Sequence, residues 1–350
     1  LGIGPCKFKN LKQRFPNIRA AYEADKASLL PILGEKLTAN FLSFRNSFNP
    51  KEELLKLNQL KIRVITQTDP LFPSNLLQIP DPPICLYVKG EIEAYDFGHD
   101  LFIAVVGTRT PTFYGQQVTQ TLVKDLVRQQ TVIVSGLALG IDAIAHLTAL
   151  ENNGRTIAVL GCGVNIIYPA ENFHLYERIF QFKGLIISEF PAAMPVAKGL
   201  FVARNRLISG LAQGVLVIEG SERSGSLITA DYAGRQGKDV FAVPAPINSK
   251  MAQAPNLLLK QGAKLVTCTQ DILEEYNRSL IPQTPTAKIL PDLSPEEKVI
   301  YTLLQNYPLT ANDLANKAKL DLQLILKLLS FLELKGIIAK NKIGKYYLCD

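Results

Sequence analysis

Residues 102–145 constrain the fold most strongly, because this stretch contains two apolar runs that each lead into a glycine-containing turn and then a helix. The runs are Phe102–Val106 and Val132–Ser135. A short apolar run without polar alternation is typical of a strand covered on both faces, which occurs mainly in parallel sheets flanked by helices. Ligands of such sheets bind beyond the carboxyl ends of the strands. We therefore expect both turns at the ligand-binding edge, facing an anion.

The same pattern recurs further along the chain. Five more segments read as strands followed by turns, at residues 156–160, 184–188, 214–219, 239–244 and 264–267. Strands that alternate with helices predict an α/β fold with a doubly wound, mostly parallel, Rossmann-like sheet. Residues 86–88, in a proline-rich connector, are expected to add a strand to this sheet.

The first turn, Gly107-Thr108-Arg109-Thr110, predicts a seat for a phosphate group. Gly107 lets the backbone approach a bound group, the threonines offer hydroxyls, and Arg109 offers a planar fork near a helix N-terminus. The turn lacks the G-x-G-x-x-G spacing of a dinucleotide site, and the chain has no P-loop motif. Nucleotide hydrolysis therefore has no visible machinery.

A second polar group is expected at the same edge. Ala203-Arg204-Asn205-Arg206 is predicted to open a helix and to add two guanidinium groups, with Lys198 and Phe201 in a loop just before it. A cation beside an exposed ring suits single-stranded nucleic acid, where stacking on a base contributes roughly 1–3 kcal/mol. The alternatives are a core position for Phe201 and surface ion pairs of the arginines with Glu189 or Glu219.

Ser224-Gly225-Ser226 forms a further turn before a helix, with Ser226 as the expected N-cap. Capping alone would explain this pattern. A functional interpretation adds backbone amides for phosphate oxygens, together with Gly136 in the second glycine turn.

Composition and charge exclude several function classes. The formal net charge is +7, but residues 1–80 carry 12 Lys and Arg against 6 Asp and Glu, whereas residues 81–280 carry 17 against 18. Anion binding by the central domain must therefore come from the local placement of a few cations.

The three histidines and five cysteines lack metal or disulfide spacing, so no metal site is expected; His146 and Cys162 are interpreted as packing residues. No stretch reaches the roughly 20 apolar residues of a membrane span, and no signal peptide is visible, so a reducing cytoplasm is expected.

The two ends of the chain differ from the centre. Residues 1–66 are predicted to form a small helical domain of the helix-hairpin-helix or SAM-like type, with a helix over about residues 27–39. Residues 67–278 form the predicted sheet domain and 279–291 a linker. Residues 292–350 read as three helices and a hairpin, the pattern of a winged helix, with Thr310 and Asp313 as an acidic variant of the capping box.

The ordered motifs of the sheet domain resemble one family. They are Gly107-Thr-Arg109, Ser135 to His146, Gly163 to Pro169, Ser188-Glu-Phe-Pro191, Phe201 to Arg206 and Ser224 to Ala230. Over about residues 67–275 they are similar to the DNA-processing protein A family (DprA, also called Smf). One departure is Pro244-Ala245, followed by Ala254-Pro255-Asn256, where the family usually has Pro-Gly and Gly-x-Asn.

The resemblance implies an extended Rossmann fold that binds single-stranded DNA, protects incoming DNA, dimerises and loads a RecA-type recombinase during natural transformation, without chemistry or a cofactor. The family's Gly-Ser-Arg turn falls on Gly107, Thr108 and Arg109. Its lysine and base-contacting phenylalanine fall on Lys198 and Phe201, and its Arg-Asn-Arg on Arg204, Asn205 and Arg206. The rival hypothesis is a nucleotide-phosphate-binding enzyme, similar to a phosphoribohydrolase, for which Glu219 is the candidate catalytic carboxylate.

Overall fold

The computed structural model describes residues 2–182, 184–278, 293–304, 308–341 and 344–348. The chain divides into two compact units, Leu1–Ile281 and Pro282–Asp350, which are described separately. The predicted linker at 279–291 lies outside the described residues. The predicted domain boundaries stay predictions.

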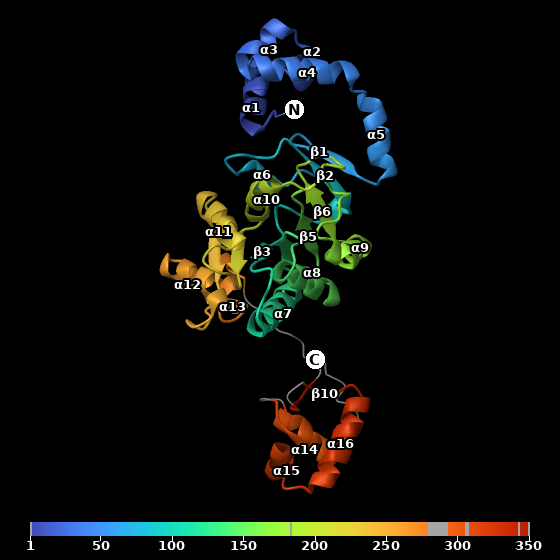
Figure 1. Cartoon of the computed structure of the whole chain (residues 1–350), viewed down its shortest axis with the longest axis vertical. Helices are drawn as coiled ribbons and strands as arrows, with labels where there is room; N and C mark the ends of the chain where they lie inside the picture. Colours follow the sequence, from blue (N-terminus) through green and yellow to red (C-terminus); the bar gives the residue numbers. More distant parts are fainter. Residues whose placement is uncertain (1, 183, 279–292, 305–307, 342–343, 349–350) are drawn as a thin grey trace. The chain divides into compact units, whose positions relative to one another are not determined.

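The centre of the first unit is a nine-stranded sheet (Figure 1). Its spatial order is β1-β2-β6-β5-β4-β3-β7-β8-β9. The strands are β1 Arg63–Thr66, β2 Cys85–Gly90, β3 Phe102–Val106, β4 Val132–Ser135, β5 Thr156–Val159, β6 Leu185–Ser188, β7 Gly214–Val217, β8 Asp239–Ala242 and β9 Lys264–Leu265. All neighbours from β6 to β9 pair in parallel, whereas β2 pairs antiparallel with both β1 and β6. The predicted doubly wound, mostly parallel sheet is confirmed.

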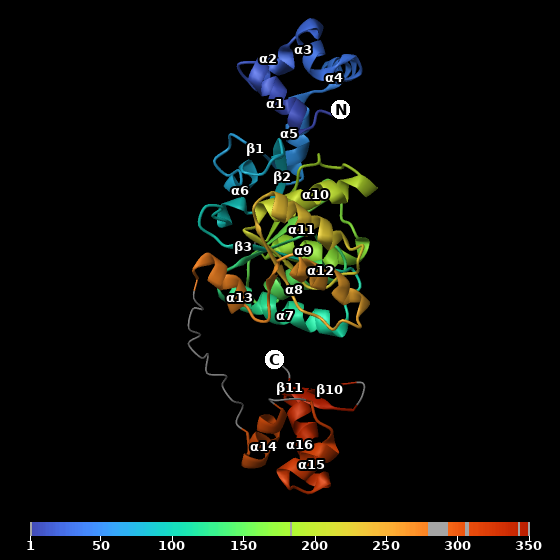
Figure 2. The ribbon, with the colours of Figure 1, turned by 90° about the vertical axis from the view of Figure 1, so that its left-hand side faces the viewer.

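Helices cover both faces of this sheet. Because successive side chains of a strand point to opposite faces, Phe102, Ala104 and Val106 of β3 pack with one layer, and Ile103 and Val105 with the other. The first layer holds α6 Ser74–Leu77, α10 Lys198–Leu211, α11 Gly225–Arg235 and α12 Gln253–Lys260. The second holds α7 Phe113–Arg128, α8 Ile141–Glu151, α9 Phe173–Gln181 and α13 Gln270–Leu273. Figure 2 shows α10 and α11 of the first layer side by side.

The N-terminal helices have a small core of their own, around Leu11, Leu29 and Phe41. They are α1 Pro5–Arg14, α2 Ile18–Glu23, α3 Lys26–Leu33, α4 Glu35–Ser47 and α5 Pro50–Gln59. Helices α1 to α4 build this core, whereas Leu57 of α5 packs with the sheet domain. The helix expected over about residues 27–39 is wrong in its extent. The chain forms two helices there, because Gly34 takes a positive φ of 79° that ends α3 and starts α4.

The second unit is a winged helix, as predicted. It contains α14 Pro295–Leu304, α15 Ala311–Ala318, α16 Leu322–Leu334 and the hairpin of β10 Ile338–Lys340 with β11 Tyr346–Leu348. Thr310 and Asp313 form the expected reciprocal capping box at the start of α15. Its core, around Ile300, Ile325 and Leu332, is separate from that of the sheet.

The order of the strands determines where a ligand can bind. From β3 the chain proceeds through β4, β5 and β6 on one side, and then returns to β7 on the other side of β3. Connections that leave β3 and β7 in opposite directions open a crevice beyond their carboxyl ends, which is the usual ligand site of such sheets.

Candidate nucleic-acid interface

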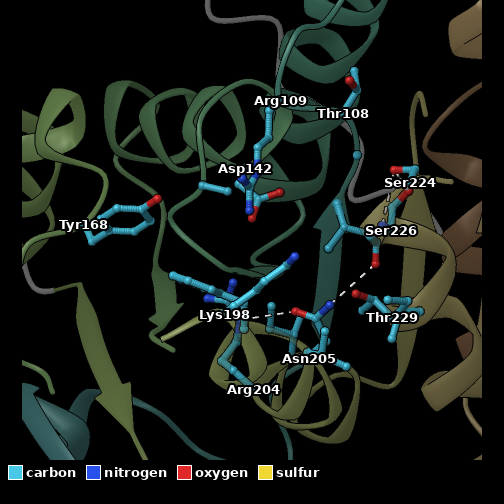
Figure 3. Close-up of a pocket in the computed structure, with 18 of the residues that line it drawn as sticks. Thr108, Arg109, Asp142, Tyr168, Lys198, Arg204, Asn205, Ser224, Ser226 and Thr229 are labelled. Atoms are coloured by element: carbon cyan, nitrogen blue, oxygen red, sulfur yellow. Dashed lines mark hydrogen bonds between the residues drawn. The ribbon is translucent and has the colours of Figure 1, made fainter. Parts of the chain in front are cut away.

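A pocket of about 700 Å³ lies at this crevice. It is lined by the turn after β3, the turn after β7, the first two turns of α10, and parts of the segments after β4 and β5 (Figure 3). Of the predicted site residues it contains Gly107, Thr108, Arg109, Lys198, Phe201, Arg204, Asn205, Ser224, Gly225 and Ser226. Gly136 and Arg206 do not line it.

The turn after β3 is fixed by backbone hydrogen bonds. The Thr108 N–H donates to the Glu219 carbonyl at 2.7 Å, and the Ile141 N–H donates to the Thr108 carbonyl at 3.1 Å. Gly107 fits because a Cβ there would lie 2.6 Å from Ile141 Cγ1 and 2.9 Å from the Glu219 carbonyl oxygen. The turn therefore holds Arg109 at the pocket on a rigid support.

Arg109 and Lys198 are the exposed cations of the pocket. Their side chains come from opposite sides and point toward one another (Figure 3). Neither forms an ion pair with a carboxylate in the described part of the chain. Both charges are therefore available to an anionic ligand.

The loop expected at Lys198 and Phe201 is wrong, since α10 begins at Lys198 rather than near Ala203. No side chain caps this helix, so the usual N-cap signal is absent. Lys198 and Phe201 lie three residues apart on the helix and therefore project from one face. Phe201 is half-buried, so neither the core alternative nor a fully exposed ring describes it.

Arg204 lines the same pocket as Arg109, but its guanidinium forms part of the buried floor. Its Nη1 donates to the carbonyl of Gly136 at 2.7 Å and also to the carbonyl of Val159. The side chain is buried. Burial lowers the pKa of Arg204 to about 10, and the neighbouring Asp142 carboxylate opposes this effect. Through these two hydrogen bonds Arg204 links the carboxyl ends of β4 and β5 beneath the pocket.

Arg206 is not among the residues that line the pocket, which corrects its predicted place at the same edge as Arg109. Its buried guanidinium pairs with Glu189 and lies 3.1 Å from Asp81. Residues three or four positions apart on a helix share a face. Arg204 and Arg206 are only two positions apart, so their side chains point in different directions. The ion-pair alternative with Glu189 therefore holds for Arg206, with the difference that the pair is buried.

The second glycine turn does not offer a free amide at Gly136. The Gly136 N–H donates to Asp142 Oδ2 at 3.1 Å. Burial raises the pKa of Asp142, while the Arg204 charge acts in the opposite sense. The expected free amide at Gly136 is therefore wrong, whereas Ala138 of the same turn does line the pocket.

The serine turn lies at the far end of the pocket from Tyr168 (Figure 3). Ser224, rather than the predicted Ser226, is the N-cap of α11, and its Oγ accepts the Ser226 N–H at 3.3 Å. The two hydroxyl groups lie 2.7 Å apart. Asn205 Nδ2 reaches the Gly225 carbonyl at 3.5 Å and links this turn to α10.

Tyr168 is a pocket residue that was not predicted from the sequence. Its ring centroid lies 5.4 Å from that of Phe201, with the planes tilted by 37°. Tyr168 stands within one of the family-like motifs, next to Pro169, but one tyrosine gives no signal of a pocket without the fold. The two rings give the pocket an aromatic end.

Glu219 does not occupy the position that a catalytic carboxylate would need. It is buried and accepts the Thr112 N–H at 2.9 Å and the Thr112 hydroxyl at 2.6 Å, beneath the start of α7. It is not among the residues that line the pocket. Asp142 is the acidic residue among the described lining residues, and it is bonded to Gly136.

His146 and Cys162 are buried below the pocket. His146 Nδ1 lies 2.7 Å from the Thr156 hydroxyl, and burial lowers the pKa of His146 to about 3, with the Arg204 charge acting in the same sense. Cys162 packs against the chain near Ile166. Across the described ranges, no group of three potential ligands could hold a metal ion. None of the described helices has both the length and the apolar character to cross a bilayer.

Comparison with known proteins decides the family. The family model for DNA recombination-mediator protein A matches residues 63–277, which is more than half of the chain. The chain belongs to this family. A model for the DprA winged helix domain matches residues 283–341.

Relatives and solved structures agree with this assignment. Protein Smf of Synechocystis is 38% identical over 294 residues, covering 83% of this chain and 74% of the relative. DNA processing protein DprA of Bacillus subtilis is 43% identical over 214 residues, covering 61% and 71%. The DprA structure from Streptococcus pneumoniae matches with a TM-score of 0.69 at 34% identity, covering 78% of this chain and 94% of that chain.

A second DprA structure, from Helicobacter pylori, was described for its single-stranded DNA binding mode. It matches with a TM-score of 0.55 at 32% identity, and it covers 62% of this chain and 96% of that chain. Members of the DNA recombination-mediator protein A family thus share the fold of the sheet domain.

Proposed function

We propose that this chain binds single-stranded DNA in the pocket at the ends of β3 and β7. The observation that carries the proposal is the convergence of two unpaired cations, Arg109 and Lys198, with an aromatic end formed by Tyr168 and Phe201. Cations that follow the sugar-phosphate chain and rings that stack on bases are the usual means of binding single strands. The single-stranded DNA binding mode described for the Helicobacter pylori protein gives independent support.

The other predicted residues have graded roles in this proposal. Thr108, Ser224 and Ser226 offer hydroxyl groups to phosphate oxygens, and Asn205 holds the serine turn. Arg204 is buried and supports the pocket floor, whereas Arg206 is buried in ion pairs away from the pocket. Gly107 and Gly225 allow close approach of the backbone.

A salt titration tests the proposal. Fluorescence anisotropy with a labelled oligothymidine is expected to show weaker binding for Arg109→Ala and for Lys198→Ala. The slope of log affinity against log salt should fall by about 0.7 for each lost phosphate contact. Unchanged affinity and slope in both variants would contradict the proposal.

Arg128→Ala is the matched control. Arg128 is an exposed arginine at the last residue of α7, about 24 Å along a 16-residue helix from the pocket end. The substitution removes the same charge far from the pocket. Its oligothymidine affinity should therefore equal that of the unmodified chain.

The finer role that we propose is protection of incoming DNA and loading of a RecA-type recombinase during natural transformation. The support is the family membership together with the name DNA processing protein carried by the relatives. Adding the chain should shorten the lag of DNA-dependent ATP hydrolysis by such a recombinase on coated single strands. No change in the lag at saturating chain would count against loading.

We also propose that the chain acts in the cytoplasm as a homodimer, with domains at 1–66, 67–278 and 292–350 joined by a linker at 279–291. The separate cores of helices α1 to α4, the sheet and the winged helix support this division, while Leu57 of α5 and strand β1 pack with the sheet. Sedimentation equilibrium should give twice the mass of one chain. A mass of one chain at every concentration would exclude the dimer.

No observation supports the rival enzyme hypothesis, because the Glu219 carboxylate accepts hydrogen bonds from Thr112 beneath α7 and does not line the pocket. Incubation with nucleoside monophosphates should release no free base. Release of base would overturn the binding proposal in favour of the enzyme.

A further inference from the structure

Tyr168 presents the more accessible of the two rings at the aromatic end of the pocket. Its side chain belongs to a residue that is 42% exposed, whereas Phe201 is half-buried. Tyr168 lines both the main pocket and an adjoining cavity of about 60 Å³, which also touches Arg109 and Leu139. Of the two rings, Tyr168 is therefore the one more accessible to a ligand from solvent.

Phe201 is covered by neighbours on several sides. A Cβ at Gly161 would lie 2.8 Å from its Cδ1 atom, so the ring rests directly on the Gly161 backbone. The Arg204 guanidinium carbon lies 5.9 Å from the ring centroid, and the Tyr168 ring lies on another side. Phe201 still lines the pocket, but these neighbours leave it less accessible than Tyr168.

The distance between the two rings excludes a base between them. A base stacked on both faces needs roughly 7 Å between the outer rings, because each stacking contact takes about 3.5 Å. The measured separation of the centroids is 5.4 Å. A base that stacks at this end therefore stacks on the open face of one ring, and Tyr168 is the more exposed of the two residues.

We propose that Tyr168 is the residue on which an unstacked base of the bound strand stacks, with Phe201 as its support. This inference rests on the proposed function and adds the ligand's orientation to it. The base lies at the Tyr168 end, while the phosphates pass Arg109 and Lys198 toward the hydroxyl groups of the serine turn (Figure 3). The ligand is a single strand, because a paired base has no free face within reach of a ring.

Substitutions at Tyr168 separate stacking from packing. With an oligothymidine, Tyr168→Phe should keep its affinity, whereas Tyr168→Leu and Tyr168→Ala should lose about 5- to 150-fold, since one stacked base contributes about 1–3 kcal/mol. The salt slope should stay constant in all three, because no charge is removed. Equal affinity of the leucine variant and the unmodified chain would overturn the inference.

Because the sequence contains no tryptophan, base stacking can be measured directly by the fluorescence of a single introduced indole. Tyr168→Trp places a single indole at the site, and oligothymidine should quench its fluorescence. An oligonucleotide of the same length without bases should bind through its phosphates with much less quenching. Equal quenching by both ligands, or none from a bound oligothymidine, would refute stacking at this position.

Phe182→Trp serves as the matched control. Phe182 is 57% exposed at the end of α9 and does not line the pocket, so its indole should keep its fluorescence in the presence of either ligand. If the unmodified chain fails to bind oligothymidine, the proposed function itself fails. If it binds and Tyr168→Ala binds equally well, only the role of Tyr168 is lost.

Discussion

Residues of one type have different roles in this pocket. Arg109 and Arg204 both line it, yet Arg109 is exposed whereas Arg204 is buried and bonded to two carbonyls. Arg206, two positions further, is buried in an ion pair elsewhere. The sequence places all three near the end of a strand or the start of a helix, but it does not contain the direction of a side chain. For Arg204 and Arg206 that direction depends on the true start of α10.

Burial of a neutral histidine makes the fold sensitive to acid. Burial lowers the pKa of His146 to about 3, whereas a histidine in the unfolded chain titrates near 6.5. Below that pH the unfolded state binds a proton that the folded state does not. The free energy of unfolding therefore falls as pH drops from about 6.5 toward 3, by up to about 1.4 kcal/mol per pH unit.

His146→Asn isolates this contribution. The variant should be less stable than the unmodified chain at pH 7.5, because it loses packing and the contact with Thr156. At pH 5.0 the deficit should be smaller by about 2 kcal/mol, since the variant lacks the group that titrates. Urea unfolding at both pH values measures the difference. A deficit that stays constant would show that His146 keeps an ordinary pKa.

At the scale of elements, strands are easier to predict from this sequence than helix ends. Each apolar run in the sheet domain became a strand, because burial on both faces leaves a continuous hydrophobic signal. The start of α10 was missed because Ala197 is its N-cap and offers no side-chain bond. Gly34 was missed because a glycine inside a helical pattern gives no indication of its φ.

The contact of α10 with the segment after β5 yields a test. Gly161→Ala would place a Cβ 2.8 Å from Phe201 Cδ1 and 3.2 Å from its Cα, so the start of α10 must shift. We expect a loss of about 1–3 kcal/mol in unfolding free energy together with weaker binding of oligothymidine. Thermal unfolding and anisotropy measure the two effects.

Gly199→Ala is the control within the same helix. A Cβ at Gly199 meets no atom within 4 Å. Alanine favours helix over glycine by about 0.5–1 kcal/mol, so this variant should be as stable as the unmodified chain or more so. Equal behaviour of the two alanine variants would show that Phe201 does not depend on Gly161.

At the scale of the whole molecule, two compact units carry separate cores. The pocket residues all belong to the first unit. The winged helix was recognisable in the sequence because its helices have strong apolar spacing and a capping box. What it contacts could not be predicted, since α16 exposes Leu326, Phe331 and Leu334 rather than a row of cations.

A chain shortened to residues 1–278 tests the separation of these units. It should keep the oligothymidine affinity of the full chain, because no pocket residue is removed. If the two units unfold independently, the shortened chain should show one unfolding transition fewer than the full chain. A tenfold loss of affinity, about 1.4 kcal/mol, would mean that the second unit contributes to binding.

The pocket is unequal along its length, with rings at one end and hydroxyl groups at the other. A polynucleotide strand also has a polarity, since its 5′ and 3′ ends differ. A strand that places its base on Tyr168 and its phosphates along Arg109 and Lys198 can satisfy all three in one polarity only. Several copies of the chain bound to one strand would then all have the same orientation relative to its 5′ end.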